Sequence, residues 1–137
     1  MRSFLSRLTV VFALLLFAGC AGDGKYPVSG TVTWNGEPIP DGHIIFTPVD
    51  AALGPDAVQF TAGKFSFRAS PGEKRVEIFA DRPLGKPDPV MNVVAHEQYI
   101  PTRYNEETEL VADVTPGGSN DFQFDLVEQK GDEKAGM

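Results

Sequence analysis

The chain has very few of the residues from which most active sites are built. Its 137 residues include one Cys, one Trp and two His. A single cysteine excludes an intramolecular disulfide, so the fold must rely on its core. The sequence has no His-Glu-x-x-His motif, no G-x-S-x-G elbow and no Walker loop, which are signatures of common enzyme classes. We therefore expect no enzymatic activity and no cofactor.

Basic residues are also scarce. Twelve Lys and Arg oppose 19 Asp and Glu, which gives a formal net charge of -7 at pH 7. An acidic surface repels the phosphate groups of nucleic acids and of anionic lipids. The sequence therefore predicts no binding to nucleic acid.

No apolar run is long enough to cross a membrane as a permanent helix. The run at residues 8–17 has about 10 residues, whereas a helix needs about 20 to cross the hydrocarbon layer. It follows Arg2 and Arg7 and precedes small residues, which is the pattern of a secretion signal. Residues 1–19 are therefore predicted to be a signal peptide.

The single cysteine, Cys20, comes directly after this signal. The sequence Phe17-Ala18-Gly19-Cys20 resembles the lipobox of bacterial lipoproteins, in which lipid is attached to the cysteine sulfur and the signal is cut just before it. The resemblance implies that Cys20 is lipidated and that residues 20–25 are a short flexible tether. The alternative is an ordinary signal peptide that leaves an unmodified cysteine.

A lipid anchor also predicts where the protein resides. We expect it in the cell envelope of a Gram-negative-type bacterium, facing the periplasm or the exterior. Ala21 after the cysteine favours the outer membrane, by analogy with sorting rules in other bacteria. The membrane is then one partner, and an envelope protein or polysaccharide is a candidate second partner.

From residue 26 onward the sequence is typical of β-strands. Apolar and polar residues alternate in VSGTVTW, so Val28, Val32 and Trp34 fall on one face, and the Asn35-Gly36 pair that follows suits a tight turn. Similar alternation recurs along the chain. Seven strands are predicted, at residues 28–34, 43–48, 58–61, 64–67, 74–81, 110–114 and 121–126.

The inward faces of these strands are strongly apolar. They include Ile44 with Phe46, Phe65 with Phe67, Val76 with Ile78, Leu110 with Ala112 and Val114, and Phe122 with Phe124 and Leu126. One flat sheet would leave these side chains in water, so two sheets must pack together. We predict an all-β fold, a seven-stranded antiparallel Greek-key β-sandwich, over residues 26–127, followed by a disordered charged tail at residues 128–137.

Several segments resemble a known family. VSGTVTWNGEPIPDGHIIFTP resembles the opening of carboxypeptidase regulatory-like domains, and AGKFSF resembles their next hairpin. PGEKRVEIFA, YIPTRYN and NDFQFDL are similar to small secreted lipoproteins of planctomycete-type bacteria that carry this domain. The resemblance covers residues 26–126. It implies a transthyretin-like (prealbumin-like) sandwich without enzymatic activity and without an established ligand.

Residues 82–108 are the segment least explained by strand patterns. They hold four prolines, and only VMNVVA, residues 90–95, suggests a short strand. Long loops in compact domains are often functional, and aromatic residues and arginine often anchor interfaces. The candidate contact residues are Tyr99, Arg103 and Tyr104. We interpret YIPTRYN as a lid over one end of the sandwich, with a recognition patch as the alternative.

Trp34 and a few acidic residues are further candidates. We interpret Trp34, beside the first turn, as a core residue, with a platform for stacking sugars as the alternative. The pair His96-Glu97 could bind a divalent ion. Three acidic residues could supply oxygen ligands to calcium: Asp113, Asp121 and Asp125. Because no complete ligand motif is present, we interpret them as solvated side chains and predict no metal site.

These observations predict a non-catalytic, lipid-anchored β-sandwich of the cell envelope, acting as a binding or structural module of unknown ligand. The alternative is a carbohydrate-binding module, in which Trp34 and the two loop tyrosines stack on sugar rings. An enzyme would require histidines and carboxylates clustered in a pocket.

Overall fold

The structure is a computed structural model that describes residues 22–130, so Cys20, the expected signal peptide and residues 131–137 lie outside it. No helix within this range is long and apolar enough to span a membrane. Residues 22–130 fold into strands and one short 3-10 helix. In order they are β1 (Tyr26–Trp34), β2 (Glu37–Pro38), β3 (Asp41–Pro48), β4 (Asp56–Thr61), β5 (Lys64–Ala69), β6 (Gly72–Phe79), β7 (Asp81–Leu84), β8 (Ala95–Gln98), η2 (Thr102–Tyr104), β9 (Val111–Val114) and β10 (Asp121–Leu126).

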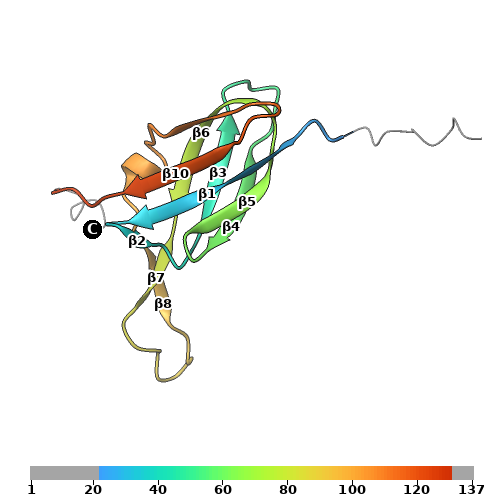
Figure 1. Ribbon diagram of the computed structural model, residues 1–137. Coiled ribbons are helices and arrows are strands. Elements are labelled where there is room, and N and C mark those ends of the chain that lie inside the picture. Colours follow the sequence, from blue (N-terminus) through green and yellow to red (C-terminus); the bar gives the residue numbers. More distant parts are fainter. Residues whose placement is uncertain (1–21, 131–137) are drawn as a thin grey trace, which may run out of the picture.

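Seven of the strands form one curled sheet, in the order β10-β1-β5-β4-β3-β6-β9, with β2 paired to β1 (Figure 1). β4 and β5 share a single register pair, Thr61 with Lys64. The sheet bends at this point, so that β10, β1 and β5 face β4, β3, β6 and β9 across the core. The predicted all-β fold of seven strands is confirmed.

The pairing of β1 with β10 is parallel, whereas the other pairings are antiparallel. Side chains alternate with the same period in both arrangements, so the sequence pattern does not distinguish them. Gly30 allows this pairing, because a Cβ atom at this position would lie 1.9 Å from the carbonyl oxygen of Phe122 and 2.6 Å from the ring of Phe65.

The core is a cluster of phenylalanine rings between the two halves of the sheet. Phe46 on β3 is fully buried, and its ring centroid lies 5.0 Å from that of Phe67 on β5 and 6.5 Å from that of Phe124 on β10. The predicted inward positions are buried or half-buried throughout. Each layer thus supplies the apolar surface that the other covers, as a sandwich requires.

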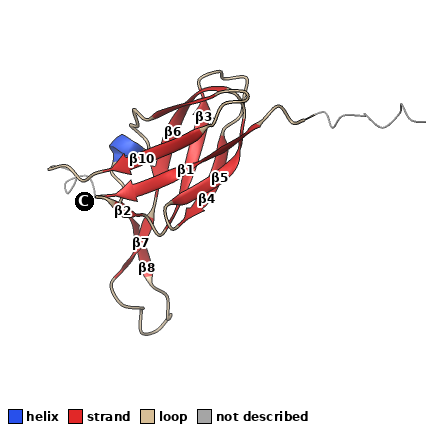
Figure 2. Ribbon diagram, in the orientation of Figure 1, coloured by secondary structure: helices blue, strands red, loops and turns tan. Residues whose placement is uncertain are grey.

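The segment of residues 82–108 differs most from expectation. β7 and β8 pair as an antiparallel hairpin that projects from one end of the sandwich (Figures 1 and 2). The short strand suggested by VMNVVA is wrong except for its last residue, Ala95, because residues 90–94 form the turn at the hairpin tip. Val90 there is 90% exposed and Met91 is 72% exposed. Apolar composition alone does not separate a buried strand from an exposed turn.

Candidate functional site

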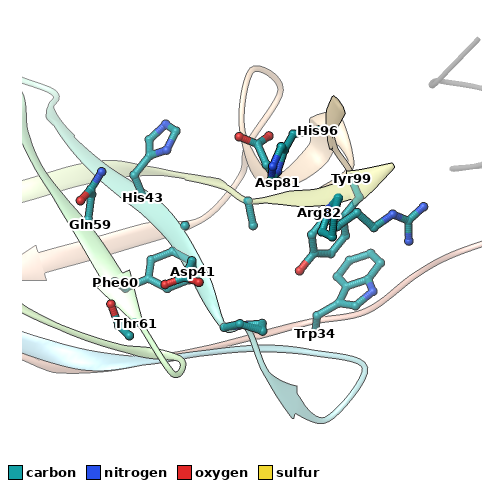
Figure 3. Close-up of a pocket in the computed structure, with 14 residues that line it drawn as sticks. Trp34, Asp41, His43, Gln59, Phe60, Thr61, Asp81, Arg82, His96 and Tyr99 are labelled. Atoms are coloured by element: carbon teal, nitrogen blue, oxygen red, sulfur yellow. The ribbon is translucent and has the colours of Figure 1, made fainter. Parts of the chain in front are cut away.

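An open cleft of about 680 Å³ lies at the base of the β7–β8 hairpin (Figure 3). Several separate segments form it: the end of β1, the start of β3, the end of β4, and the two sides of the hairpin. These strand ends meet because β3 and β4 are paired and because β6 leads directly into β7. The side chains and backbone that line it belong to Trp34, Pro40, Asp41, Gly42, His43, Gln59, Phe60, Thr61, Ala80, Asp81, Arg82, Pro83, His96 and Tyr99.

One side of the cleft is aromatic. The rings of Trp34 and Tyr99 meet edge to face, with centroids 5.9 Å apart and planes at 78°. The guanidinium carbon of Arg82 lies 5.2 Å from the centre of the Tyr99 ring, and its Nε donates a 2.5 Å hydrogen bond to Glu97. Trp34 and Tyr99 are half-buried against the core. This side therefore offers flat apolar surfaces held in place by their neighbours.

Burial raises the pKa of the Tyr99 hydroxyl, and the nearby Arg82 charge opposes this effect only partly. The hydroxyl is thus protonated at neutral pH and able to donate a hydrogen bond. Figure 3 shows Tyr99 beside Trp34 and Arg82.

The other side of the cleft is polar. Asp41, His43 and Gln59 come from paired positions of β3 and β4, while Asp81 and His96 come from the hairpin. The ring of His43 stacks on Phe79 of β6, with centroids 4.9 Å apart and planes at 11°. The stacking fixes the plane of the His43 ring on the outer face of the sheet.

Gly42 is required for this geometry. A Cβ atom at position 42 would lie 2.4 Å from the ring of Phe60 and 2.5 Å from the carbonyl oxygen of Phe79. The glycine therefore lets the Phe60 ring pack close beneath the cleft.

Two histidines line the cleft, His43 and His96. Within residues 22–130 neither of them forms a hydrogen bond to a carboxylate. Nor do three His, Cys, Asp or Glu side chains of the described chain gather closely enough to hold a metal ion. The cleft thus places the rings of Trp34 and Tyr99, with the Tyr99 hydroxyl, beside carboxylate, amide and imidazole groups.

The candidate contact residues divide into two groups. Trp34 and Tyr99 meet in the cleft, whereas Arg103 and Tyr104 lie in η2 and bind the chain just after β10. The Tyr104 hydroxyl accepts a 3.1 Å hydrogen bond from the Val127 N–H and lies 3.2 Å from the Val127 carbonyl oxygen, to which Arg103 also donates. For Tyr104, this is the geometry that the lid interpretation predicts.

A buried asparagine completes this lid. Asn105 is 1% exposed, and its side-chain amide donates hydrogen bonds of 3.4 Å to Ile78 and 3.1 Å to Ile100. The segment after the hairpin is thus attached to the end of β6 through buried contacts. Cys20, the candidate lipidation site, lies outside the described residues.

The acidic candidates do not come together. Glu97 pairs with Arg82, while its neighbour His96 lines the cleft. Asp113 lies on β9 and Asp121 on β10, and neither belongs to a group of three acidic, His or Cys side chains among the described residues. Asp125 accepts a 2.8 Å hydrogen bond from Thr33.

Sequence reasoning missed six polar residues of the cleft: Asp41, His43, Gln59, Thr61, Asp81 and Arg82. Each is an ordinary residue near a strand end. The one available signal is that Asp41 precedes one buried strand and Asp81 follows another, which places both at the same end of the sandwich.

Comparison with known proteins adds no relative. The chain matches no family model, no curated protein and no solved structure. The similarity to carboxypeptidase regulatory-like domains therefore rests on the sequence motifs quoted above.

Proposed function

We propose that the protein is a non-catalytic, lipid-anchored binding module of the bacterial cell envelope, with the cleft at the base of the β7–β8 hairpin as its binding site. The observation that carries this proposal is the cleft itself. It combines the half-buried rings of Trp34 and Tyr99 with a row of polar side chains, which is the composition typical of ligand sites.

The position of the cleft supports an anchored binding module. Trp34 ends the strand that Tyr26 begins, and nine residues of β-strand span roughly 26 Å from first to last Cα. A lipid on Cys20 would thus be attached near one end of the sandwich while the cleft lies at the other. A ligand in the envelope space could reach the cleft without competition from the membrane.

The strand order supports the expected family and topology. The order β6-β3-β4-β5 fits a Greek key, in which a fourth strand returns beside the first of three hairpin-connected strands. We assign the chain on this basis, together with its motifs, to the transthyretin-like carboxypeptidase regulatory-like domains. The outer membrane is the proposed location.

The alternative proposed function is carbohydrate binding. The pair of Trp34 and Tyr99 specifically favours it, because two rings beside carboxylate, amide and imidazole groups can combine stacking with hydrogen bonds to hydroxyl groups. Tyr104 takes no part, since its hydroxyl is bound to Val127.

The anchor is tested by Cys20→Ala in the source bacterium. The unmodified chain should sediment with membranes, and its amino-terminal peptide should carry the mass of the acyl chains. The variant should instead be released in soluble form. A variant that stays with the membranes would contradict the anchor.

The cleft is tested through Trp34, which is the only tryptophan and therefore reports on this site alone. Peptidoglycan fragments and outer-membrane polysaccharide are titrated while its fluorescence and its quenching by iodide are measured. Carbohydrate binding predicts a spectral shift and protection from iodide, both lost in Tyr99→Ala and kept in Tyr104→Phe. No response to either glycan would exclude the carbohydrate alternative.

A broader test covers ligands of any class. Envelope components are captured on the anchored protein and compared with those captured on an Arg82→Ala, Tyr99→Ala double variant. A double variant that captures the same components with the same affinity would contradict the cleft as the binding site.

A further inference from the structure

The residues just before β1 are bound to the sandwich by ion pairs. Asp23 lies 3.0 Å from Arg68 of β5, and Arg68 also donates a 2.5 Å hydrogen bond to the carbonyl oxygen of Lys25. The Lys25 ammonium lies 2.5 Å from Asp56, which is 8% exposed and also accepts a hydrogen bond from the Ser70 N–H. The chain before the first strand is thus attached to one end of the sandwich at two points.

This attachment leaves little free chain between the body and a lipid on Cys20. Only Ala21 and Gly22 lie between Cys20 and Asp23, so three Cα-to-Cα steps separate the two residues and span at most about 11 Å when extended. The acyl chains would therefore enter the bilayer close to Asp23. The end of the sandwich that carries Asp23 and Lys25 must face the membrane.

The β3–β4 loop, residues 49–55, lies at this same end. Asp56, the partner of Lys25, directly follows the loop. The loop sequence is VDAALGP, and all seven residues are exposed, including Val49 at 67% and Leu53 at 41%. Its one charged side chain, Asp50, accepts a 3.0 Å hydrogen bond from the Ala52 N–H. The loop therefore presents an almost uncharged apolar surface next to the attachment point.

We propose that the β3–β4 loop rests in the headgroup region of the bilayer that holds the lipid on Cys20, as a second membrane contact. This inference rests on the lipid anchor of the proposed function. Exposed apolar side chains next to a membrane gain by entering the boundary between headgroups and acyl chains. The two basic side chains beside the loop are already paired, Arg68 with Asp23 and Lys25 with Asp56, so the proposed contact does not depend on anionic lipid.

The hairpin tip is the competing apolar surface, since Val90 and Met91 are more exposed than the loop's Val49 and Leu53. Its base adjoins Trp34 through Tyr99, at the other end of β1 from the attached segment. The attachment of the leading segment thus places the β3–β4 loop next to the bilayer and the hairpin away from it.

The experiment uses the full chain, processed and lipidated in cells and reconstituted in phosphatidylcholine vesicles. Because the chain has no second cysteine, Leu53→Cys creates the one thiol that remains free after lipidation. It is labelled with an environment-sensitive fluorophore, and Met91→Cys is labelled as the matched control. Quenching by lipids that carry a nitroxide near the headgroup is then measured in vesicles recovered by flotation.

The label at position 53 should be blue-shifted and strongly quenched, and the label at position 91 should respond as it does in water. Arg68→Gln, which removes both contacts of Arg68 with the leading segment, should reduce quenching at position 53 while flotation persists. Val49→Cys provides a second loop position if Leu53→Cys affects folding.

Two results would overturn the proposal: no quenching at position 53 in floated vesicles, or stronger quenching at position 91. Protein that does not float and carries no acyl mass would instead overturn the anchor, and the loop contact with it.

Discussion

The β3–β4 loop and the tip of the β7–β8 hairpin are built alike but lie at opposite ends of the molecule. Each exposes large apolar side chains around one aspartate that binds backbone N–H groups. Asp50 accepts from Ala52, while Asp88 accepts 2.8 Å hydrogen bonds from Val90 and Met91. These bonds hold the pKa of Asp88 below its usual range. In both places the carboxylate stabilises the turn and leaves the apolar side chains facing outward.

The two loops differ in what supports them. The β3–β4 loop connects strands whose alternate residues are buried in the core, such as Phe46 and Phe60. The hairpin stands on β7 and β8, in which no side chain is buried. A loop held by the core is suited to fix the orientation of the domain, whereas a hairpin held only at its base can adapt to a ligand in the adjoining cleft.

The largest loss of stability is expected from a substitution in the core that supports the β3–β4 loop. Phe46→Ala should lower the free energy of unfolding by about 3–5 kcal/mol, because it removes a fully buried ring that touches both layers. Urea denaturation followed by circular dichroism measures the change. Met91→Ala, at the hairpin tip, is the control and should change stability by less than about 0.5 kcal/mol. Equal losses in the two variants would contradict the difference in support.

A buried lysine at the anchored end gives the second prediction. Lys74 on β6 is fully buried, and its ammonium donates hydrogen bonds of 2.7 Å to Ser70 and 3.3 Å to the carbonyl oxygen of Pro71. Burial lowers its pKa, and the charges of Asp56 and Asp50 oppose this only partly. The folded protein therefore releases this proton at a lower pH than the unfolded chain does.

The pKa of Lys74 in the folded protein lies below its value near 10.5 in the unfolded chain. At a pH between these two values the unfolded state binds more protons than the folded state. The free energy of unfolding should therefore rise with pH in this window, by at most about 1.4 kcal/mol per pH unit. Tyr99, whose pKa is raised by burial, counteracts this rise only above about pH 10. Lys74→Met should abolish the rise, whereas Lys86→Met at the hairpin should keep it. Urea midpoints measured from pH 7 to pH 10 test this, and an identical rise in Lys74→Met would refute it.

The curled sheet and the β7–β8 hairpin also differ in how well the sequence predicts them. The seven strands of the curled sheet are predictable because burial on one face imposes an apolar residue at every second position, as in Ile44 and Phe46. β7 and β8 have no such pattern, since no side chain of DRPL or AHEQ is buried. Backbone pairing and the ion pair of Arg82 with Glu97 hold the two strands together, and neither interaction requires alternating apolar residues in the sequence.

Only part of the cleft can be predicted from the sequence in this way. Trp34 and Tyr99 are large aromatic residues near turns, so residue type alone marks them as candidates. Asp41, His43 and Gln59 become site residues only because β3 and β4 end beside the hairpin, which is a property of the topology. Arg103 and Tyr104 show the converse, since residue types favoured at interfaces here serve an internal contact.

That internal contact gives a smaller prediction at the hairpin end. Tyr104→Phe removes the hydroxyl that binds the backbone of Val127 and should cost about 0.5–1.5 kcal/mol of unfolding free energy. Tyr99→Phe is the control, because no hydrogen bond from its hydroxyl is formed within residues 22–130, and it should cost less. Thermal unfolding of the two variants measures the difference. The reverse ranking would mean that the cleft tyrosine, and not the lid, holds this end together.

The smallest effect on stability is expected from the hairpin tip itself. Replacing residues 85–94 with Asn-Gly, which suits a tight turn between β7 and β8, should change the free energy of unfolding by less than about 0.5 kcal/mol. The tip side chains Val90, Met91 and Val93 are exposed, so their removal uncovers no core.

Amide hydrogen exchange should correspondingly be fast in β7 and β8 and slow in β3 and β6, because few buried contacts oppose local opening of the hairpin. If the replacement instead destabilised the protein as much as Phe46→Ala does, the hairpin would be part of the folding unit. If stability is unchanged and ligand binding in the cleft is lost, these ten residues serve binding, which would explain why the hairpin tip keeps such an exposed apolar surface.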